Sequence, residues 1–363
     1  MTVAADDAQL AALAAAIKTW GRELGFQQVG IADIDLSTHE ARLLDWLAGG
    51  FHGEMDYMAR HGLKRGRPAE LLPGTVRAIA ARMDYLPPAA AAPWPVLNQP
   101  DLGYVSRYAL GRDYHKVLRQ RLQRLAERIA AAIGPFGYRV FTDSAPVLEK
   151  ALAEKAGLGW IGKHSNLLDR RIGSWFFLGE IYVDLPLPAD RSTGTHCGRC
   201  TACLEICPTQ AIVAPYRVDA RRCISYHTIE LRGPIPPEFR RAVGNRIYGC
   251  DDCQLVCPWN RFAQPSGEPD FRVRHGLDAP RLIELFGWDE AKFLRRTEGS
   301  AIRRIGHERW LRNIAVALGN APRSVAVVVA LQGRMAHPSA LVREHVAWAL
   351  TEQASKSVDT SGL

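Results

Sequence analysis

Cysteine is confined to one short stretch of this 363-residue sequence, with none before Cys197 and none after Cys257. The chain also lacks any run close to the roughly 18–20 consecutive apolar residues that cross a membrane as a helix. Its first residues include Asp6 and Asp7, where a secretory signal would carry positive charge. We therefore expect a cytoplasmic protein with no membrane span and no thiol chemistry in its N-terminal half.

The first 190 residues also lack an H-E-x-x-H zinc motif and a paired-carboxylate signature. A G-x-G-x-x-G pattern runs from Gly157 to Gly162, but a nucleotide-binding loop needs a strand before it and a helix after it. Here a helical segment precedes the glycines. We expect these glycines to let the backbone pass close to a bulky ligand or another strand.

Apolar periodicity in this N-terminal part predicts alternating helices and strands. The expected helices cover residues 8–23, 114–133 and 147–156, and the expected strands cover residues 76–85, 138–142 and 174–183. Residues 89–100 form an Ala- and Pro-rich connection without strong periodicity. The alternation indicates an α+β fold arranged as an α/β sandwich.

The cysteines form two runs with ferredoxin spacing. The first is Cys197-x2-Cys200-x2-Cys203-x3-Cys207 and the second is Cys250-x2-Cys253-x3-Cys257, each followed by proline. In bacterial ferredoxins three cysteines of such a run bind one [4Fe–4S] cluster, and the fourth binds the other cluster. The isolated Cys223 completes the count, so the eight thiols predict two clusters.

In a chain of this size without a secretory signal, metal binding explains eight cysteines better than four disulfides. The ferredoxin rule assigns Cys197, Cys200, Cys203 and Cys257 to cluster 1, and Cys207, Cys223, Cys250 and Cys253 to cluster 2. Two four-cysteine zinc sites are the alternative. Zinc favours two separated C-x2-C pairs, whereas three cysteines here crowd into seven residues, which favours iron–sulfur.

Positive charge exceeds negative charge, with a formal net charge of +8 and a pI of about 9.2. Arginine is concentrated in residues 221–246 and 295–312, each with six arginines against two glutamates. The forked guanidinium group suits contacts to phosphate. A nucleic-acid partner and a solvated basic surface both remain possible explanations.

After residue 262 the pattern is mainly helical. Segments 312–318 and 344–350 share an A-x-A-L ending 32 residues apart, a weak repeat that indicates a short HEAT-like array. We expect three domains, comprising an α/β domain at 1–190, a ferredoxin-like two-cluster domain at 191–262 and HEAT-like helices at 263–363.

Five sequence blocks resemble the epoxyqueuosine reductase family. They are SRYALGRDYHKVLR (106–119), TDSAPVLEKALAEKAGLGWIGKHSNLL (142–168), CGRCTACLEICPTQAI (197–212), GNRIYGCDDCQLVCPWNRF (244–262) and EGSAIRRIGHERWLRNIAVALGNAP (298–322). The resemblance covers nearly the whole chain. It implies an enzyme that depends on cobalamin and two [4Fe–4S] clusters, with the corrinoid bound by the N-terminal domain.

The reaction implied by this resemblance is the two-electron reduction of an epoxide. The epoxide of epoxyqueuosine, at the wobble position of tRNA, would give queuosine and water. Cysteine-ligated clusters supply single electrons at low potential, and cobalamin provides redox chemistry that no side chain offers. The implied partners are epoxyqueuosine-containing tRNA and a low-potential electron donor, and we expect a monomer.

The resemblance also implies site residues. Asp143 occupies the family's proton-donor position, and we expect burial beside the corrinoid to raise its pKa so that it is protonated near neutral pH. The alternative is that Asp143 or Ser144 only caps the following helix. The implied cobalamin contacts are Arg65, Ser106, Arg107, Asp143, Lys163, Leu167, Ser174 and Ser225.

An anticodon-stem substrate needs phosphate contacts around the mouth of the active site. We place Arg240, Arg241, Arg246, Arg303, Arg304 and Arg312 on that face. Two other classes stay open, a corrinoid reductive dehalogenase-like reductase of a small molecule and a ferredoxin-like electron carrier. The former should lack the basic helical C-terminus, and the latter leaves Asp143 without a role.

Overall fold

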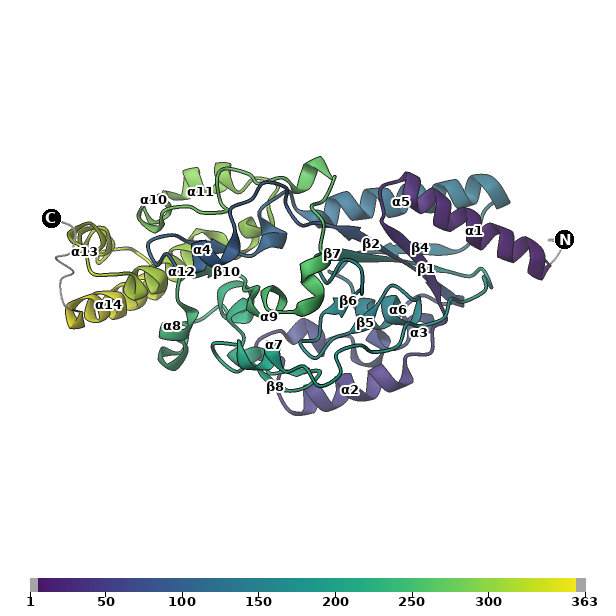
Figure 1. Cartoon of the computed structure of the whole chain (residues 1–363), viewed down its shortest axis with the longest axis horizontal. Helices are drawn as coiled ribbons and strands as arrows, with labels where there is room; N and C mark the ends of the chain where they lie inside the picture. Colours follow the sequence, from purple (N-terminus) through teal and green to yellow (C-terminus); the bar gives the residue numbers. More distant parts are fainter. Residues whose placement is uncertain (1–5, 357–363) are drawn as a thin grey trace.

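The computed structural model describes residues 6–356. The molecule is elongated, with the N-terminal helix and the C-terminal helices at opposite ends and the cysteine-containing segment between them (Figure 1). None of the helices within residues 6–356 combines the length and the apolar character that crossing a membrane requires.

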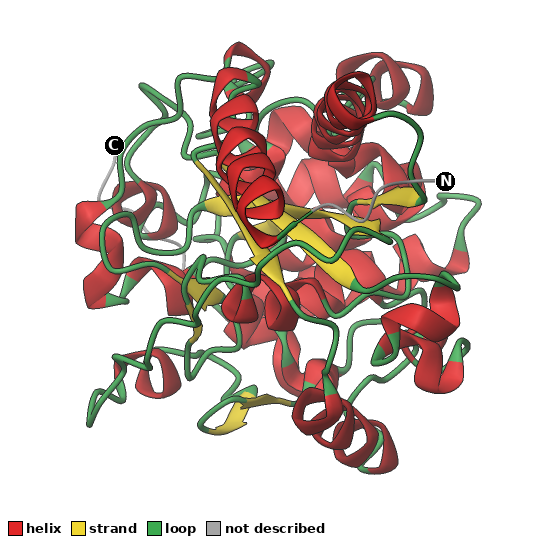
Figure 2. Ribbon diagram, turned by 90° about the vertical axis from the view of Figure 1, so that its right-hand side faces the viewer, coloured by secondary structure: helices red, strands yellow, loops and turns green. Residues whose placement is uncertain are grey.

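A four-stranded sheet forms the centre of the N-terminal part. Its strands, in spatial order, are β1 (Gln28–Ala32), β2 (Arg77–Asp84), β7 (Phe176–Val183) and β4 (Tyr138–Phe141). All neighbouring strands are antiparallel. The two central strands are almost entirely buried, as expected for strands covered on both faces, and Figure 2 shows helices on both sides of the sheet.

Different helices cover the two faces of this sheet. They are α1 (Asp7–Glu23) and α5 (Tyr114–Ile133) on one face and α6 (Glu149–Lys155) on the other. Because side chains alternate along a strand, Ile181 of β7 packs with Leu122 of α5, whereas its neighbour Tyr182 packs with Leu152 of α6. The predicted helix 114–133 has the observed bounds of α5.

The remaining elements of the first 262 residues are short apart from α2. They are α2 (Ser37–Ala48), α3 (Pro68–Leu71), α4 (Pro93–Leu97), β3 (Tyr104–Val105), β5 (Trp160–Ile161), β6 (Leu167–Leu168), α7 (Ala202–Glu205), β8 (Ile212–Ala214), β9 (Arg217–Val218), α8 (Pro237–Val243), β10 (Arg246–Tyr248) and α9 (Asp252–Leu255). Neither β1 nor α2 was predicted from the sequence. The glycine pattern follows α6, includes β5 and is followed by β6 in place of a helix, and a Cβ on Gly159 would lie 2.1 Å from the carbonyl oxygen of Leu168 in β6. The close approach to another strand is therefore confirmed.

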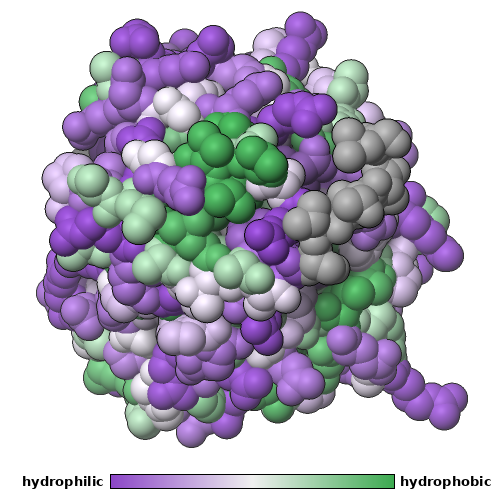
Figure 3. Space-filling view, turned by 90° about the vertical axis from the view of Figure 1, so that its left-hand side faces the viewer, coloured by the Kyte–Doolittle hydropathy of each residue, from purple (hydrophilic) through white to green (hydrophobic). Residues whose placement is uncertain are grey.

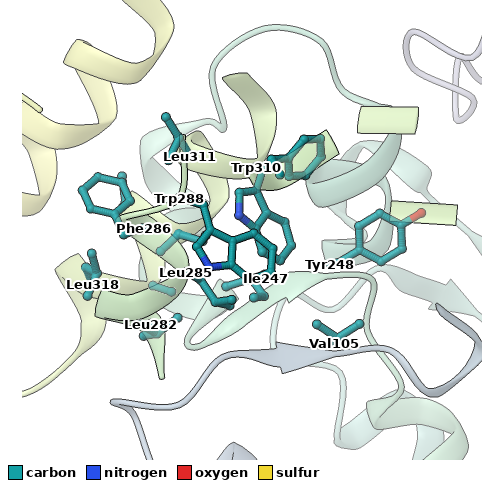
Figure 4. Close-up of a cluster of buried hydrophobic side chains, with 14 of the residues drawn as sticks. Val105, Ile247, Tyr248, Leu282, Leu285, Phe286, Trp288, Trp310, Leu311 and Leu318 are labelled. Atoms are coloured by element: carbon teal, nitrogen blue, oxygen red, sulfur yellow. The ribbon is translucent and has the colours of Figure 1, made fainter. Parts of the chain in front are cut away.

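Helices make up the C-terminal part. They are α10 (Leu282–Phe286), α11 (Glu290–Arg296), α12 (Gly306–Asn320), α13 (Val325–Gln332) and α14 (Ala340–Ser355). The two A-x-A-L segments lie on α12 and α14, which pack so closely that a Cβ on Gly319 would lie 2.5 Å from the Trp348 ring. Val105, Ile247 and Trp310 share one core (Figure 4), so these helices pack directly against β3 and β10.

The end of the molecule that carries the C-terminal helices exposes hydrophobic side chains. Figure 3 shows a hydrophobic patch on this end. On α13, Val325 is 81% exposed and Val329 is 59% exposed. This surface lies at the far end from the sheet.

Gly30 of β1 fixes the position of α6, because a Cβ at Gly30 would lie 2.1 Å from the carbonyl oxygen of Ala156, directly after that helix. We expect Gly30→Ala to lower the free energy of unfolding by about 1–3 kcal/mol through overpacking. Chemical denaturation measures the change. Gly194→Ala is the control because a Cβ there meets no atom within 4 Å. Equal stability of the two variants would contradict this role of Gly30.

Candidate functional site

The structure brings the eight cysteines together in two groups of four, and all eight are free thiols. The first cysteine set, Cys197, Cys200, Cys203 and Cys257, lines a cavity of about 230 Å³. The second cysteine set, Cys207, Cys223, Cys250 and Cys253, lines a larger cavity of about 380 Å³. These are the groupings that the ferredoxin rule predicts, with the last cysteine of each run placed in the other group.

Two short helices create this crossed arrangement. Cys203 lies on α7 and Cys253 lies on α9, and these helices pack against each other. Each run ends at a Cys-Pro pair directly beyond its helix, which sends the fourth thiol towards the opposite group. Within residues 6–356, no three His, Cys, Asp or Glu side chains lie in an arrangement that could bind one metal ion.

The larger cavity is shared by the second cysteine set and by residues of the N-terminal sheet. Phe176 and Leu178 of β7 line it, as do Asp143 and Glu149. Its volume of about 380 Å³ lies within the usual range of ligand-binding pockets. The Nε2 atom of His164, which also lines it, is buried and has no hydrogen-bond partner among residues 6–356. The cavity therefore fits a bulky ligand that offers an acceptor or donor.

Five of the eight predicted cobalamin contacts line this cavity, namely Ser106, Asp143, Leu167, Ser174 and Ser225. Two of these serines are held by neighbours from the cysteine segment. Ser106 Oγ donates to Asp251 at 2.5 Å, and Gln254 Nε2 donates to Ser174 Oγ at 2.9 Å. The walls of the cavity are thus tied to the loops that carry the thiols.

The other three predicted contacts do not line the cavity. Arg65 is buried and donates to the carbonyl oxygens of Tyr57 and Ala145. Arg107 is also buried and lines a different pocket. Lys163 Nζ donates to the carbonyl oxygen of Cys200 at 2.9 Å and lines the cavity of the first cysteine set. Each side chain is occupied by backbone carbonyls, which the sequence did not reveal.

Asp143 lies directly after β4, at the cavity wall. Its backbone has φ = 51°, a left-handed conformation that is unusual for a residue other than glycine and is common at functional sites. Its side chain is 48% exposed because it faces the cavity. The helix-cap alternative is wrong, because α6 begins only at Glu149 and no side chain caps it.

The first turn of α5 surrounds the Asp143 carboxylate with polar groups. The Tyr114 hydroxyl donates to Asp143 Oδ2, and His115 Nε2 lies 3.2 Å from the same oxygen. His115 Nδ1 lies 2.7 Å from Asp113, which also caps α5 and pairs with Arg304 at 2.7 Å. One imidazole thus bridges two carboxylates.

This arrangement corrects the expected pKa of Asp143. Burial alone would raise the pKa, but hydrogen bonds from His115 and Tyr114 and the charges of His115 and Arg304 lower it below the ordinary value. Burial would likewise lower the pKa of His115, but its bonds to Asp113 and Asp143 raise it. The proton near Asp143 is therefore held by His115 in the protein alone.

Three residues in or near the cavity were not predicted from the sequence. They are Tyr114, His115 and Glu149. All three lie within the blocks quoted above, next to Asp113 or just after Asp143. The sequence feature that could have indicated the residues of the first turn of α5 is Asp113 as a helix cap, because a cap fixes where the first helical turn points. Only packing of α5 on the sheet places that turn beside the end of β4.

Three of the six arginines predicted to contact tRNA are directed inwards. Arg312 is fully buried and donates to the carbonyl oxygens of His227, Leu231 and Gly233. Arg240 is 2% exposed and pairs with Glu344. Arg246 is largely buried and pairs with Asp252. Their prediction as phosphate contacts is wrong, because each guanidinium is used inside the protein.

The other three arginines are exposed. Arg241 pairs with Glu352 on α14, away from the cavity. Arg303 and Arg304 line a separate pocket of about 280 Å³ together with Arg112 and Lys116. This basic pocket adjoins the Asp143 site, because Arg304 pairs with Asp113. Asp113 pairs with Arg304 and Asp270 pairs with Arg112, so the positive charge of the pocket comes mainly from Lys116 and Arg303, for which no carboxylate partner is found among residues 6–356.

Comparison with known proteins agrees with this geometry. Residues 196–260 match the family described as "4Fe-4S double cluster binding domain", and residues 65–144 match "Epoxyqueuosine reductase QueG, DUF1730". The epoxyqueuosine reductase of Pseudomonas aeruginosa is 65% identical over 341 residues, which cover 94% of each chain. The chain belongs to the epoxyqueuosine reductase family. The family member from Escherichia coli is 63% identical over 342 residues, 94% of this chain and 89% of the relative.

Solved structures of epoxyqueuosine reductases have the same fold. One contains an epoxyqueuosine-modified stem loop of tRNA-Tyr and superposes with a TM-score of 0.87 at 27% identity, covering 95% of this chain and 91% of the other. The Streptococcus thermophilus enzyme gives a TM-score of 0.84 at 26% identity over 96% and 94% of the two chains. The predicted family, the mixed helix–strand fold and the two [4Fe–4S] clusters are thus confirmed.

Iron binding tests the two cysteine sets. Reconstituted protein should bind about eight iron atoms, four for each cluster. Cys257→Ala should lose the same cluster as Cys197→Ala, because both thiols line one cavity. Iron quantification and electron paramagnetic resonance of the reduced protein distinguish the two clusters. If Cys257→Ala instead resembled Cys253→Ala, its neighbour in sequence, the crossed assignment would be wrong.

Proposed function

We propose that this chain reduces the epoxide of epoxyqueuosine in tRNA to give queuosine and water. The observation that carries the proposal is one cavity whose wall contains four free cysteines and the Asp143 carboxylate. Such a cavity places an electron source and a proton source on either side of one reactive group. A ferredoxin-like electron carrier would need the thiols alone.

In this proposal the two clusters form a path for electrons. The first cysteine set lies nearer the surface, because Cys200 is exposed, and it would receive single electrons from a low-potential donor. The second set would pass them into the larger cavity, whose wall it forms. The contact between α7 and α9 keeps the two sets close, as electron transfer requires.

Cobalamin is the cofactor that we propose for the larger cavity. Ser106, Leu167, Ser174 and Ser225 would hold it, together with His164 and its unpartnered Nε2. When bound, the corrinoid supplies low-valent cobalt, which delivers electrons to carbon in a way that no side chain does. The protein orients the substrate, excludes water and controls protons around it.

We propose that Asp143 delivers the proton to the epoxide oxygen and that His115 supplies it. Because the pKa of Asp143 is lowered and that of His115 is raised, the resting proton is on the imidazole. Transfer across the 3.2 Å contact to Asp143 places it at the cavity wall. The left-handed backbone of Asp143 directs its carboxylate towards the cavity rather than along the sheet.

For tRNA we propose phosphate contacts at the basic pocket of Arg112, Lys116, Arg303 and Arg304. These side chains come from both ends of the sequence and adjoin the Asp143 site. A small-molecule reductase has no use for such a pocket. We further propose the domain division 1–190, 191–262 and 263–363 with an α/β sandwich and HEAT-like helices, a monomeric state and a cytoplasmic location, where tRNA is found.

Substitution of Asp143 tests the proton donor. Asp143→Ala should lower the single-turnover rate on epoxyqueuosine tRNA by about 10²–10⁴-fold, the range that general acids contribute, without loss of tRNA binding. Ser144→Ala is the matched control in the same loop, since its hydroxyl contacts only the carbonyl oxygen of Thr142. Normal turnover by Asp143→Ala would remove this residue from the mechanism.

Charge reversal tests the tRNA pocket. The double variant Lys116→Glu/Arg303→Glu should weaken tRNA binding and reduce the slope of log Kd against log salt by roughly one per lost phosphate contact. Filter binding over a salt series measures both. Arg22→Glu on α1, outside the pocket, reverses a charge elsewhere and serves as the control. An unchanged affinity at every salt concentration would refute the placement.

A further inference from the structure

Three carboxyl groups approach one another from three different elements behind the cavity wall. Asp143 follows β4, Glu149 is the first residue of α6, and Glu180 lies in the middle of β7. Glu180 is paired in register with Phe141 of β4, only two residues before Asp143. Glu149 itself lines the cavity. The proposed mechanism so far uses only Asp143.

Glu180 is the most unusual member of this group. It is fully buried, and neither of its side-chain oxygens has a hydrogen-bond partner among the described residues. Because side chains alternate along a strand, Glu180 lies on the same face of β7 as Phe176 and Leu178, which line the cavity. An ionised carboxylate without a partner is very costly in such a place, so the group takes up a proton instead.

The charged groups that act on Glu180 do not stabilise its ionised form. The groups that act on it are Glu149 and Asp143, and both are acidic. Lys150 and His115 act on Glu149, and Arg65 faces Asp143 and Glu149. Other charged or titratable groups on this face are Tyr182, which is neutral, Arg82, which pairs with Asp84 and Asp169, and Arg139, whose guanidinium lies over the Phe141 ring.

Both glutamates consequently favour the protonated form. Burial raises the pKa of Glu149 to about 8, and the negative charge of Asp143 adds to the rise against Lys150, His115 and the backbone N–H of Asp143. Burial and the charges of Glu149 and Asp143 raise the pKa of Glu180 well above its ordinary value. The shifts favour a proton on both glutamates, whereas the pKa of the neighbouring Asp143 is lowered.

The stoichiometry of the proposed reaction calls for such a reserve. Converting an epoxide to an alkene and water breaks both C–O bonds of the ring, forms the C=C bond, and consumes two electrons and two protons. The Asp143–His115 unit supplies one proton. The second is needed while substrate and cofactor fill the cavity and displace water from it. A proton held inside the protein meets that need.

We propose that Glu149 at the cavity wall and the buried Glu180 form a proton store that supplies the second proton of the reaction through Asp143. The proposal rests on the proposed function and deepens it. After Asp143 has given up its proton, the O–H bond of Glu149 breaks as an O–H bond forms on the Asp143 carboxylate. Glu180 then protonates Glu149. The two electrons come from the low-potential donor through the clusters, so the proton transfers need no further reactant, and both glutamates support Asp143 without touching the epoxide.

The test compares Glu149→Gln and Glu180→Gln with Tyr182→Phe. Tyr182 is the matched control, because its buried hydroxyl lies on the same face of β7 and also lacks a partner. Infrared spectra at neutral pH should show the C=O stretch of protonated carboxyl groups in the unaltered protein and in Tyr182→Phe. Glu180→Gln should lack part of that band. This measurement requires neither cofactor nor substrate.

Turnover provides the second measurement. With clusters and cobalamin loaded, both Gln variants should bind tRNA normally and react about tenfold more slowly, a modest part of the effect of general acid catalysis. An acid with a raised pKa holds its proton below that pKa and loses it as pH rises. The rate of the unaltered enzyme should therefore fall as pH passes about 8. This basic limb should disappear in Glu149→Gln and return in part in Glu149→Asp.

The outcomes separate this inference from the proposed function. If both Gln variants keep the rate, the pH profile and the infrared band of Tyr182→Phe, the proton store is refuted while the reductase function stands. If the unaltered, fully loaded protein fails to reduce epoxyqueuosine tRNA, the proposed function is wrong. In that case a C=O band lost in Glu180→Gln still supports the protonated pair.

Discussion

Asp251 stands between two cysteines of the second set and accepts hydrogen bonds from three donors on a distant segment. The Tyr104 hydroxyl at 2.8 Å, the Ser106 hydroxyl at 2.5 Å and the Arg107 backbone N–H at 2.8 Å all converge on its carboxylate. The side chain is 1% exposed, and a buried carboxylate is stable only when such donors satisfy it. Because β10 pairs with β3 immediately beside this contact, the thiol loop cannot move independently of the cavity wall. One buried acid therefore ties the loop that carries Cys250 and Cys253 to the segment 104–107 of the cavity wall.

Hydrogen bonding also determines the direction in which the pKa of Asp143, another residue of the cavity wall, is shifted. The sequence predicted a raised pKa for Asp143 from burial, but its partners come from the first turn of α5, where Tyr114 and His115 point at the same oxygen. Two donors and a nearby positive charge outweigh desolvation of one carboxylate. Glu149 lies in the same neighbourhood without comparable donors, and there burial dominates. The pKa values of two acids in one cavity thus shift in opposite directions, because only Asp143 receives side-chain hydrogen bonds from the first turn of α5.

The sequence was most informative where function depends on spacing within a short segment. The cysteine runs predicted two groups of four, and the structure gathers those groups, because Cys-x2-Cys positions and a following proline act locally. Long amphipathic helices such as α5 were predicted with their observed bounds for the same reason. Arginine composition was a poor guide, since Arg312 and Arg241 look alike in sequence and differ entirely in exposure. Glu180 was missed because a lone acid in an apolar strand acquires meaning only from what packs over it.

Electrons and protons reach the cavity from different parts of the chain, and electrostatics couples the two supplies. Each electron that enters a poorly solvated cavity adds negative charge, which acts strongly on nearby groups because the effective dielectric constant is low. Negative charge raises the pKa of a neighbouring carboxyl group and the proton affinity of His115. Reduction therefore increases the tendency of Asp143 to take a proton from its neighbours, and proton transfer in turn makes the next electron easier to accept. In the proposed mechanism, protonated acids behind the cavity wall and cluster-binding thiols beside the cavity would thereby couple the supply of protons to the supply of electrons.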